Sequence, residues 1–178
     1  WKYEINLSIE DVSVNLTFVG KSEGWKIETD STCWTVPIPT ADVTGTISFK
    51  GKTEKVNGTG YHDHNWGYSP TTVLQNIGWY WGRITAEQLH ITWANTIISK
   101  TKQDLITVVN KPFKDNNEPP FFNSIHPNEI KLTTKNYKKY NKILIPHSFQ
   151  LLFNKKSTPS TPELSGKLTM DTIDVHYN

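Results

Sequence analysis

The sequence predicts an all-β protein built from antiparallel strands with little helix. Apolar residues recur at every second position in many short segments, such as 1–9 and 12–19, and this alternation is typical of half-buried strands. Glycine, proline, asparagine and aspartate separate these segments at short intervals. No ten-residue window carries a convincing helical stripe. We therefore expect about ten strands in an antiparallel barrel or sandwich.

The expected strands follow one another along the chain. Segment 1–9 places Trp1, Tyr3 and Ile5 on one face, and segment 12–19 alternates in the same way from Val12. Segment 44–60 reads as a hairpin with its turn at 50–52. The later strands are expected at 74–99 (two strands joined near 86–88), 104–110, 129–134, 142–153 and 163–177. Segments 111–123 and 154–163 read as a loop and a polar connector.

Composition excludes several classes of protein. With 178 residues the chain fits one domain or two small ones. The net charge of +2 and the absence of a long basic run argue against a nucleic-acid partner. Cys33 is the only cysteine, which excludes a disulfide framework and a cysteine-based zinc cluster. No apolar run is long enough to span a bilayer, so we expect no transmembrane segment.

The first residue, Trp1, lies inside an expected strand rather than before it. We therefore expect the chain to be a piece of a longer protein, whose signal peptide, if there is one, lies outside this sequence. The compartment stays open, and secretion and membrane association are both compatible with the sequence. The oligomeric state is open as well.

One short segment concentrates chemically useful side chains. Residues 58–70, GTGYHDHNWGYSP, contain two histidines, a carboxylate, a tryptophan and two tyrosines. In an extended strand neighbouring side chains point to opposite faces. The two alternating sets are His62, His64 and Trp66 on one face, and Tyr61, Asp63 and Asn65 on the other.

Metal binding is one interpretation of this segment. His62 and His64 lie on one strand face, so both imidazoles can reach the same metal ion. Zinc needs a third protein ligand, and no spacing in the sequence selects one. We therefore expect no metal and no other cofactor. Ordinary turn chemistry explains Asp, Asn, Gly and Pro one by one. It does not explain why so many hydrogen-bonding and aromatic residues occur together.

Proton transfer is a second interpretation. Burial raises the pKa of a carboxyl group and a nearby imidazolium lowers it, so Asp63 beside two histidines is a candidate general acid or base. Indole rings nearby could stabilise a positive centre. This combination suits protonation of an apolar alkene better than ester hydrolysis, because the chain has no Gly-x-Ser-x-Gly element.

A second aromatic segment, GWYWGR, occupies residues 78–83. Alternation puts Trp79 and Trp81 on one face and Tyr80 on the other. The flanking glycines suggest bends or close backbone approach. Arg83 is the only arginine, and its planar fork suits a buried pair with Asp63 or with an acidic group of a ligand. A packed aromatic strand with a surface arginine is the alternative.

The two segments together resemble a known family. GTGYHDHNWG (58–67) followed by WYWGR (79–83) resembles the hydroxyneurosporene synthase family, which comprises the carotenoid 1,2-hydratases and the AttH-like proteins. A similar motif occurs in lipocalin-like Diels–Alderases, and CWTVPIP (33–39) adds a weaker likeness. The resemblance implies an antiparallel lipocalin-like (calycin-type) β-barrel. It also implies two such barrels in a longer chain, with an apolar pocket near their junction. Residues 1–178 would then be the later part, with a boundary near 111–123.

The resemblance also implies roles for particular residues. It points to His64 and Trp66 as catalytic residues. The hydratases use a Tyr-x-Asp pair further along the chain, where this sequence has Tyr80-Trp81-Gly82. Asp63 or His64 would therefore have to supply the proton. The expected ligand-binding residues are Tyr61, His62, Asn65, Trp79, Tyr80, Trp81 and Arg83.

Three functions follow from this reading. The first is binding, with acid-catalysed hydration, of an apolar isoprenoid or polyene. Asp63 or His64 would donate the proton, Trp66 and Trp79 would stabilise the cation, and water would add to it. The second is a pericyclase that folds a polyene without needing an acid. The third is a non-catalytic carrier. Each has an apolar small molecule as the expected partner.

Overall fold

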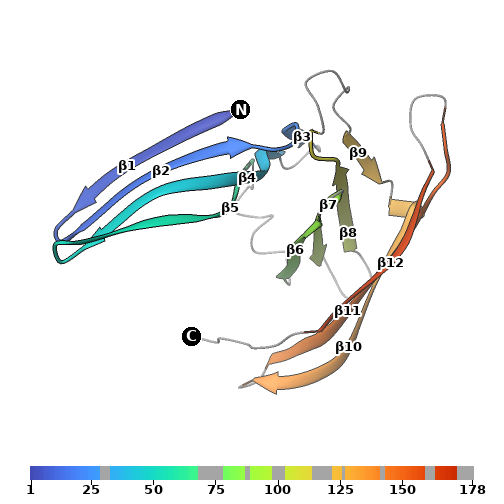
Figure 1. Ribbon diagram of the computed structural model, residues 1–178. Helices are drawn as coiled ribbons and strands as arrows, with labels where there is room; N and C mark the ends of the chain where they lie inside the picture. The colour runs from blue at the N-terminus through green and yellow to red at the C-terminus, as the bar shows by residue number, and fades with distance from the viewer. Residues whose placement is uncertain are drawn as a thin grey trace.

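The computed structural model describes residues 1–28, 33–67, 78–86, 89–97, 103–113, 122–125, 127–140, 143–158 and 163–171 (Figure 1). Within these residues there are twelve strands and one short 3-10 helix, η1 (Pro127–Glu129), but no α-helix. All strand pairs are antiparallel. The predicted all-β fold class is therefore confirmed. No helix in the described part of the chain is long and apolar enough to cross a membrane.

The first sheet contains five strands. They are β1 (Lys2–Ile9), β2 (Val12–Gly20), β3 (Trp25–Glu28), β4 (Cys33–Phe49) and β5 (Lys52–Trp66). The order is β1-β2-β4-β3, and β5 also pairs with β4. The β4–β5 turn consists of Lys50 and Gly51, which both have positive φ, so the predicted turn at 50–52 is confirmed.

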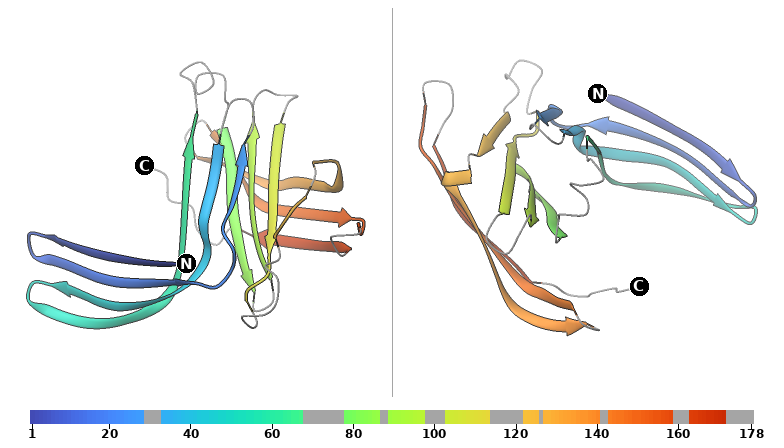
Figure 2. Two further views of the ribbon diagram at one scale, coloured as in Figure 1. Left: turned by 90° about the horizontal axis from the view of Figure 1, so that it is seen from above. Right: turned by 180° about the vertical axis from the view of Figure 1, so that it is seen from behind.

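Two further sheets complete the fold. The second contains β6 (Gly78–Ala86), β7 (Leu89–Ile97), β8 (Gln103–Asn110) and β9 (Phe122–Ile125), in that order. The third contains β10 (Ile130–Tyr140), β11 (Ile143–Lys155) and β12 (Leu164–Asp171). Figure 2 shows that the strands of the third sheet run across those of the second, while the upper parts of β4 and β5 run alongside them. The result is a curled, open half-barrel.

The second sheet buries both of its faces. One face packs on the third sheet, where Ile91 and Trp93 meet Leu151 and Phe153. The other face packs on the first sheet, where Val108 meets Trp25, Trp34 and Val36. Burying a large apolar side chain stabilises a fold by roughly 1.5–3 kcal/mol. The two contact layers therefore hold the second sheet firmly between its neighbours.

The far part of the first sheet extends away from the other two sheets (Figure 1). We call this part, which consists of β1, β2, residues 41–49 and residues 52–60, the arm. Strand pairing gives the arm one polar face and one apolar face. The apolar residues of this face are Tyr3, Ile5, Leu7, Ile9, Val12, Val14, Leu16, Phe18, Val43, Ile47, Phe49 and Val56. The ion pair of Lys52 and Glu54 lies on the same face, at its β5 edge near the tip. Its base is covered by Ile38 and Ala41, but Leu7, Ile9 and Phe49 near the tip are exposed.

Two β-bulges explain how the first sheet buries opposite faces at its two ends. Between the pairs Thr35–His64 and Ile38–His62, β4 advances by three residues while β5 advances by two, and the same shift recurs before Ala41–Gly60. Each extra residue turns the following side chains of β4 to the other face. Trp34 and Val36 therefore face the second sheet, whereas Ile38 belongs to the arm's core.

Most of the expected strands are present, and the differences have identifiable causes. The short β3 and the first half of β4 were not expected, because Pro37 and Pro39 interrupt the alternation near the bulges. The predicted loop 111–123 overlaps β9 at residues 122–123. Residues 114–121, the core of the proposed boundary, lie outside the described residues, as do residues 172–178 of the last expected strand.

Gly60 is predicted to be required for packing at the base of the arm. A Cβ at Gly60 would lie 2.4 Å from the Phe18 ring, whereas a Cβ at Gly58 would meet nothing within 4 Å. We expect Gly60→Ala to lower the free energy of unfolding by about 1–3 kcal/mol. Gly58→Ala, on the same face of β5, should change it by at most about 0.5 kcal/mol. Urea unfolding measures both variants, and equal effects would contradict this packing.

Candidate functional site

Three side chains of the first sheet meet around one carboxylate. Tyr61 donates its hydroxyl hydrogen to Asp63 Oδ2 over 3.0 Å, and Trp34 Nε1 donates to the same oxygen over 3.0 Å. Tyr61 and Asp63 are half-buried, on the face of β5 that is turned toward the second sheet. The three residues form a partly buried polar network at the edge of the aromatic core.

β6 brings two more predicted residues to this network. The Trp81 ring meets the Tyr61 ring edge-on, with 5.7 Å between centroids. The Arg83 guanidinium lies over the same Tyr61 ring, with its central carbon 4.9 Å from the centroid. A cation over an aromatic face is attracted by the electron-rich ring. Tyr61, Asp63, Trp81 and Arg83, which the sequence places in two separate segments, thus lie together.

An exposed aromatic surface begins where the first sheet stops covering the second. Trp79 and Trp81 share one face of β6, since they pair with Thr96 and Ala94 of β7. Trp81 is 45% exposed and Trp79 is 72% exposed. We call Tyr61, Trp79 and Trp81 the aromatic surface. It continues the buried cluster of Trp25, Trp34 and Val108 outward to solvent.

The electrostatics of the network keep Tyr61 protonated. Burial raises the pKa of the Tyr61 phenol well above its ordinary value, and the negative charge and hydrogen bond of Asp63 raise it further. Trp81 and the positive charge of Arg83 act weakly in the opposite direction. Tyr61 is therefore a fixed donor at neutral pH rather than a source or acceptor of protons.

Among the described residues Arg83 does not pair with Asp63, one of the two partners that the sequence suggested. The expected Arg83–Asp63 ion pair is absent from the ion pairs of the described residues, and the guanidinium stacks on Tyr61 instead. Arg83 Nη1 is buried and has no hydrogen-bond partner within the described part of the chain. Leaving such a donor unpaired costs about 1–3 kcal/mol, and more for a charged group.

Further buried polar groups lie on the same face of the second sheet. His90 is 5% exposed, and neither of its ring nitrogens has a partner among the described residues. Burial, helped by the positive charges of Lys21 and Arg83, lowers the pKa of His90, so its ring is neutral. Asn110, its direct neighbour on β8, donates to the Glu23 carbonyl over 3.2 Å, while its Oδ1 is buried without a described partner.

The predicted residues His62, His64 and Trp66 lie on the opposite face of β5. The His62 ring meets the Tyr3 ring edge-on at 5.2 Å, and the His64 ring stacks on Trp66 at 5.2 Å. The Lys26 ammonium lies 5.6 Å from the Trp66 ring centroid. All three residues are exposed, on the side that continues the apolar face of the arm. The expected catalytic residues Asp63, His64 and Trp66 therefore do not share one site within this chain.

Two other expected ligand residues are also separated. Tyr80 points to the far face of β6 and packs edge-on against Phe149 at 5.4 Å, in the core with the third sheet. Asn65 is exposed on the same face as Asp63, and it pairs across the strands with Trp34 of β4.

Trp34 belongs to the polar network but was not predicted as a site residue. The likeness in CWTVPIP was the only signal for it, because strand pairing between β4 and β5 is not visible in the sequence.

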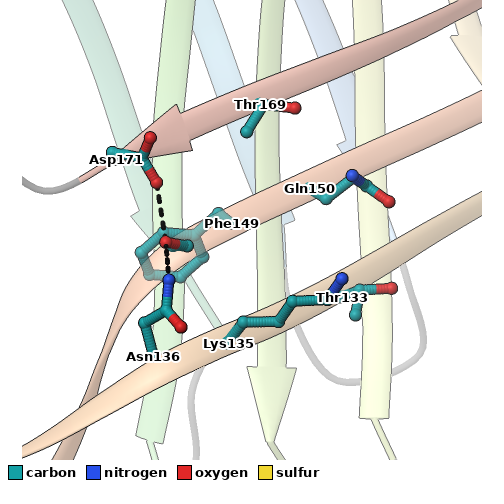
Figure 3. A pocket seen from close by; sticks show the side chains of 8 residues that line it. Thr133, Lys135, Asn136, Phe149, Gln150, Thr169 and Asp171 are labelled. Atoms are coloured by element: carbon teal, nitrogen blue, oxygen red, sulfur yellow. Dashed lines mark hydrogen bonds between the residues drawn. The ribbon is translucent and has the colours of Figure 1, made fainter.

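Within the described part of the chain these residues form no metal cluster, and a polar pocket lies apart from them. No group of three or more His, Cys, Asp or Glu side chains with a metal-binding arrangement occurs in the described ranges. A shallow polar pocket lies on the third sheet (Figure 3). There Asn136 donates to Ser148 Oγ over 2.8 Å, and Ser148 donates to Asp171 Oδ1 over 2.6 Å. This pocket contains none of the residues predicted to form the site.

Comparison with known proteins identifies the fold. No protein-family model and no curated protein matches the chain. Among solved structures, a crystal structure of a protein from Nitrosomonas europaea, provisionally named AttH, is similar with a TM-score of 0.60 and 12% sequence identity. The match covers 85% of this chain and 49% of that protein, so the chain spans about half its length. The AttH-like, lipocalin-like fold implied by the resemblance is thus confirmed, while identity this low establishes the fold alone.

Asp63 is predicted to be important for stability because two donors depend on it. Asp63→Ala leaves the Tyr61 hydroxyl and Trp34 Nε1 without their acceptor, which should lower the free energy of unfolding by about 1–3 kcal/mol. Asp42→Ala is the matched control, since Asp42 is an exposed β4 carboxylate paired with Lys21 at 3.2 Å. Its loss should cost less than about 1 kcal/mol. Denaturant unfolding that found the two losses equal would contradict the network.

Proposed function

We propose that this chain binds an apolar, isoprenoid or polyene-like small molecule against the aromatic surface of Tyr61, Trp79 and Trp81. The observation that carries the proposal is the exposure of two neighbouring tryptophans on one face of β6. A flat, rigid polyene suits such a surface, because indole rings bury a large area with few rotatable bonds. The AttH-like, lipocalin-like fold supports the proposal, since barrels of this kind commonly hold one small ligand.

The polar groups at this surface fit binding better than acid catalysis. Asp63 Oδ2 already accepts two hydrogen bonds, and Tyr61 is held in its protonated state. A carrier or a pericyclase needs only the shape of the surface and fixed hydrogen-bond donors. In either role, Tyr61 and Arg83 would orient a ligand and the tryptophans would provide contact area.

Acid-catalysed hydration is the second candidate, and a specific contact favours it. His64 stacks on Trp66 on the face of β5 that continues the apolar face of the arm, so an imidazole and an indole ring lie together there. On this alternative, His64 protonates an alkene carbon and Trp66 stabilises the cation. The ligand would then lie on the arm side of β5, away from Asp63.

Trp81→Ala and Trp66→Ala distinguish the two surfaces. The two side chains are similarly exposed, at 45% and 40%, but lie on different faces of the fold. We expect Trp81→Ala to raise the dissociation constant for methyl cis-parinarate about tenfold or more, as for a central aromatic contact. Trp66→Ala should change it less than about threefold. The fluorescence of the probe itself reports binding, so loss of a tryptophan does not disturb the signal. The opposite pattern would favour the hydration surface.

We also propose that the chain is the later part of a two-barrel protein in which other residues cover the arm. The support is the contrast between the arm's polar face and its exposed apolar face, since exposed apolar patches of this kind mark interaction surfaces. In a longer protein of this kind, amides of β1 and β2 should exchange hydrogen more slowly than in the 178-residue chain. If these amides exchange at equal rates in the two proteins, the proposal that other residues cover the arm is wrong.

A further inference from the structure

Four buried polar side chains on one side of the second sheet have unmet hydrogen-bonding capacity. On this side the atoms without a partner among the described residues are Arg83 Nη1, both ring nitrogens of His90, Asn110 Oδ1 and Ser22 Oγ. Trp93 Nε1 and Thr107 Oγ1 also lack one, on the opposite face of the second sheet. Buried polar groups in native proteins nearly always have partners, so a cluster of exceptions calls for an explanation. An isolated orphan can reflect local packing, but four close together suggest a missing binding partner.

Strand register brings these side chains together. His90 pairs directly with Asn110 of β8, and Arg83 pairs with Thr92, two residues from His90 on the same face. Side chains that are direct or diagonal neighbours across strands lie within reach of one another. Ser22 is placed beside them, since the carbonyl of the next residue, Glu23, accepts a hydrogen bond from Asn110. Arg83 is the partly buried member of this cluster, and His90, Asn110 and Ser22 lie buried behind it.

The cluster is directly connected to the aromatic surface. Arg83 is only partly buried, and the ring that covers its guanidinium is Tyr61, a member of that surface. A ligand lying on Trp81 and Tyr61 therefore has Arg83 at one end of it.

The donors of the cluster match an acidic group. Arg83 is the only arginine of the chain, and its fork binds carboxylates through two parallel hydrogen bonds. The described part of the protein gives it no carboxylate partner. A neutral His90 can donate from one ring nitrogen, and Ser22 can donate its hydroxyl hydrogen. Asn110 Oδ1 only accepts, so it needs a water or hydroxyl rather than the carboxylate.

We infer that Arg83, with His90 and Ser22 behind it, forms a subsite for the carboxylate end of the apolar ligand. The inference rests on the proposed ligand binding at the aromatic surface and adds the chemical class of the ligand, a polyene or isoprenoid acid. The hydrocarbon part lies on Tyr61, Trp79 and Trp81, and the carboxylate pairs with the guanidinium beside the Tyr61 ring.

A matched pair of probes tests the subsite separately from the aromatic surface. cis-Parinaric acid and its methyl ester have the same polyene but differ in charge. We expect the wild-type chain to bind the acid at least about tenfold more tightly than the ester, as for a charge-assisted hydrogen bond. Arg83→Gln should abolish this preference, because it weakens binding of the acid by a much larger factor than binding of the ester. Lys167→Gln, which removes a charge from the third sheet, should preserve it.

Each outcome decides one of the two proposals. Equal binding of acid and ester by the wild-type chain overturns the carboxylate subsite and leaves ligand binding standing. A preference for the acid that survives in Arg83→Gln also overturns it. Failure of both probes to bind overturns the proposed function, and the subsite with it. If Arg83→Gln does not fold, Arg83→Lys and the wild-type comparison of acid with ester still decide the question.

Discussion

The structure depends on a mismatch in length between β4 and β5. Two bulges give β4 two extra residues over the stretch that pairs with residues 60–64, so its side chains change faces twice while those of β5 do not. As a result Trp34 and Val36 pack on the second sheet while Ile38 packs within the arm. Without this change Ile38 would lie on the same face as Trp34 and Val36, and the core at the base of the arm would lose it.

The same constraint divides the chemically rich segment of β5 between two environments. On one face, Tyr61 and Asp63 join Trp34, and β6 adds Trp81 and Arg83. On the other face, His64 and Trp66 stack on each other beside the arm. A ligand can use one of these surfaces within this chain but not both. We favour the first for binding, because its aromatic rings, the hydrogen-bond donor Tyr61 and the guanidinium of Arg83 adjoin one another.

Much of this organisation could be predicted from the sequence, and the failures have physical causes. Alternation located most strands and divided residues 61–66 correctly into two faces, because the side-chain period of a strand is fixed. It could not tell which face points inward, since that depends on pairing between β4 and β5. The prolines that hid the first half of β4 also hid Trp34. His90 and Asn110 gave no signal, because only strand register places them near Arg83. The hydration hypothesis left open whether Asp63 or His64 supplies the proton, and β5 places only His64 on the face of Trp66.

The most direct test of this account is fluorine NMR of the chain labelled with fluorotryptophan, which has seven tryptophans to report on both faces. Replacing each tryptophan in turn by phenylalanine assigns the signals, and methyl cis-parinarate is then added. The account predicts that the signals of Trp79 and Trp81 shift and broaden while that of Trp66 stays unchanged. A shift of the Trp66 signal with Trp79 and Trp81 undisturbed would contradict it and move the ligand to the arm side of β5.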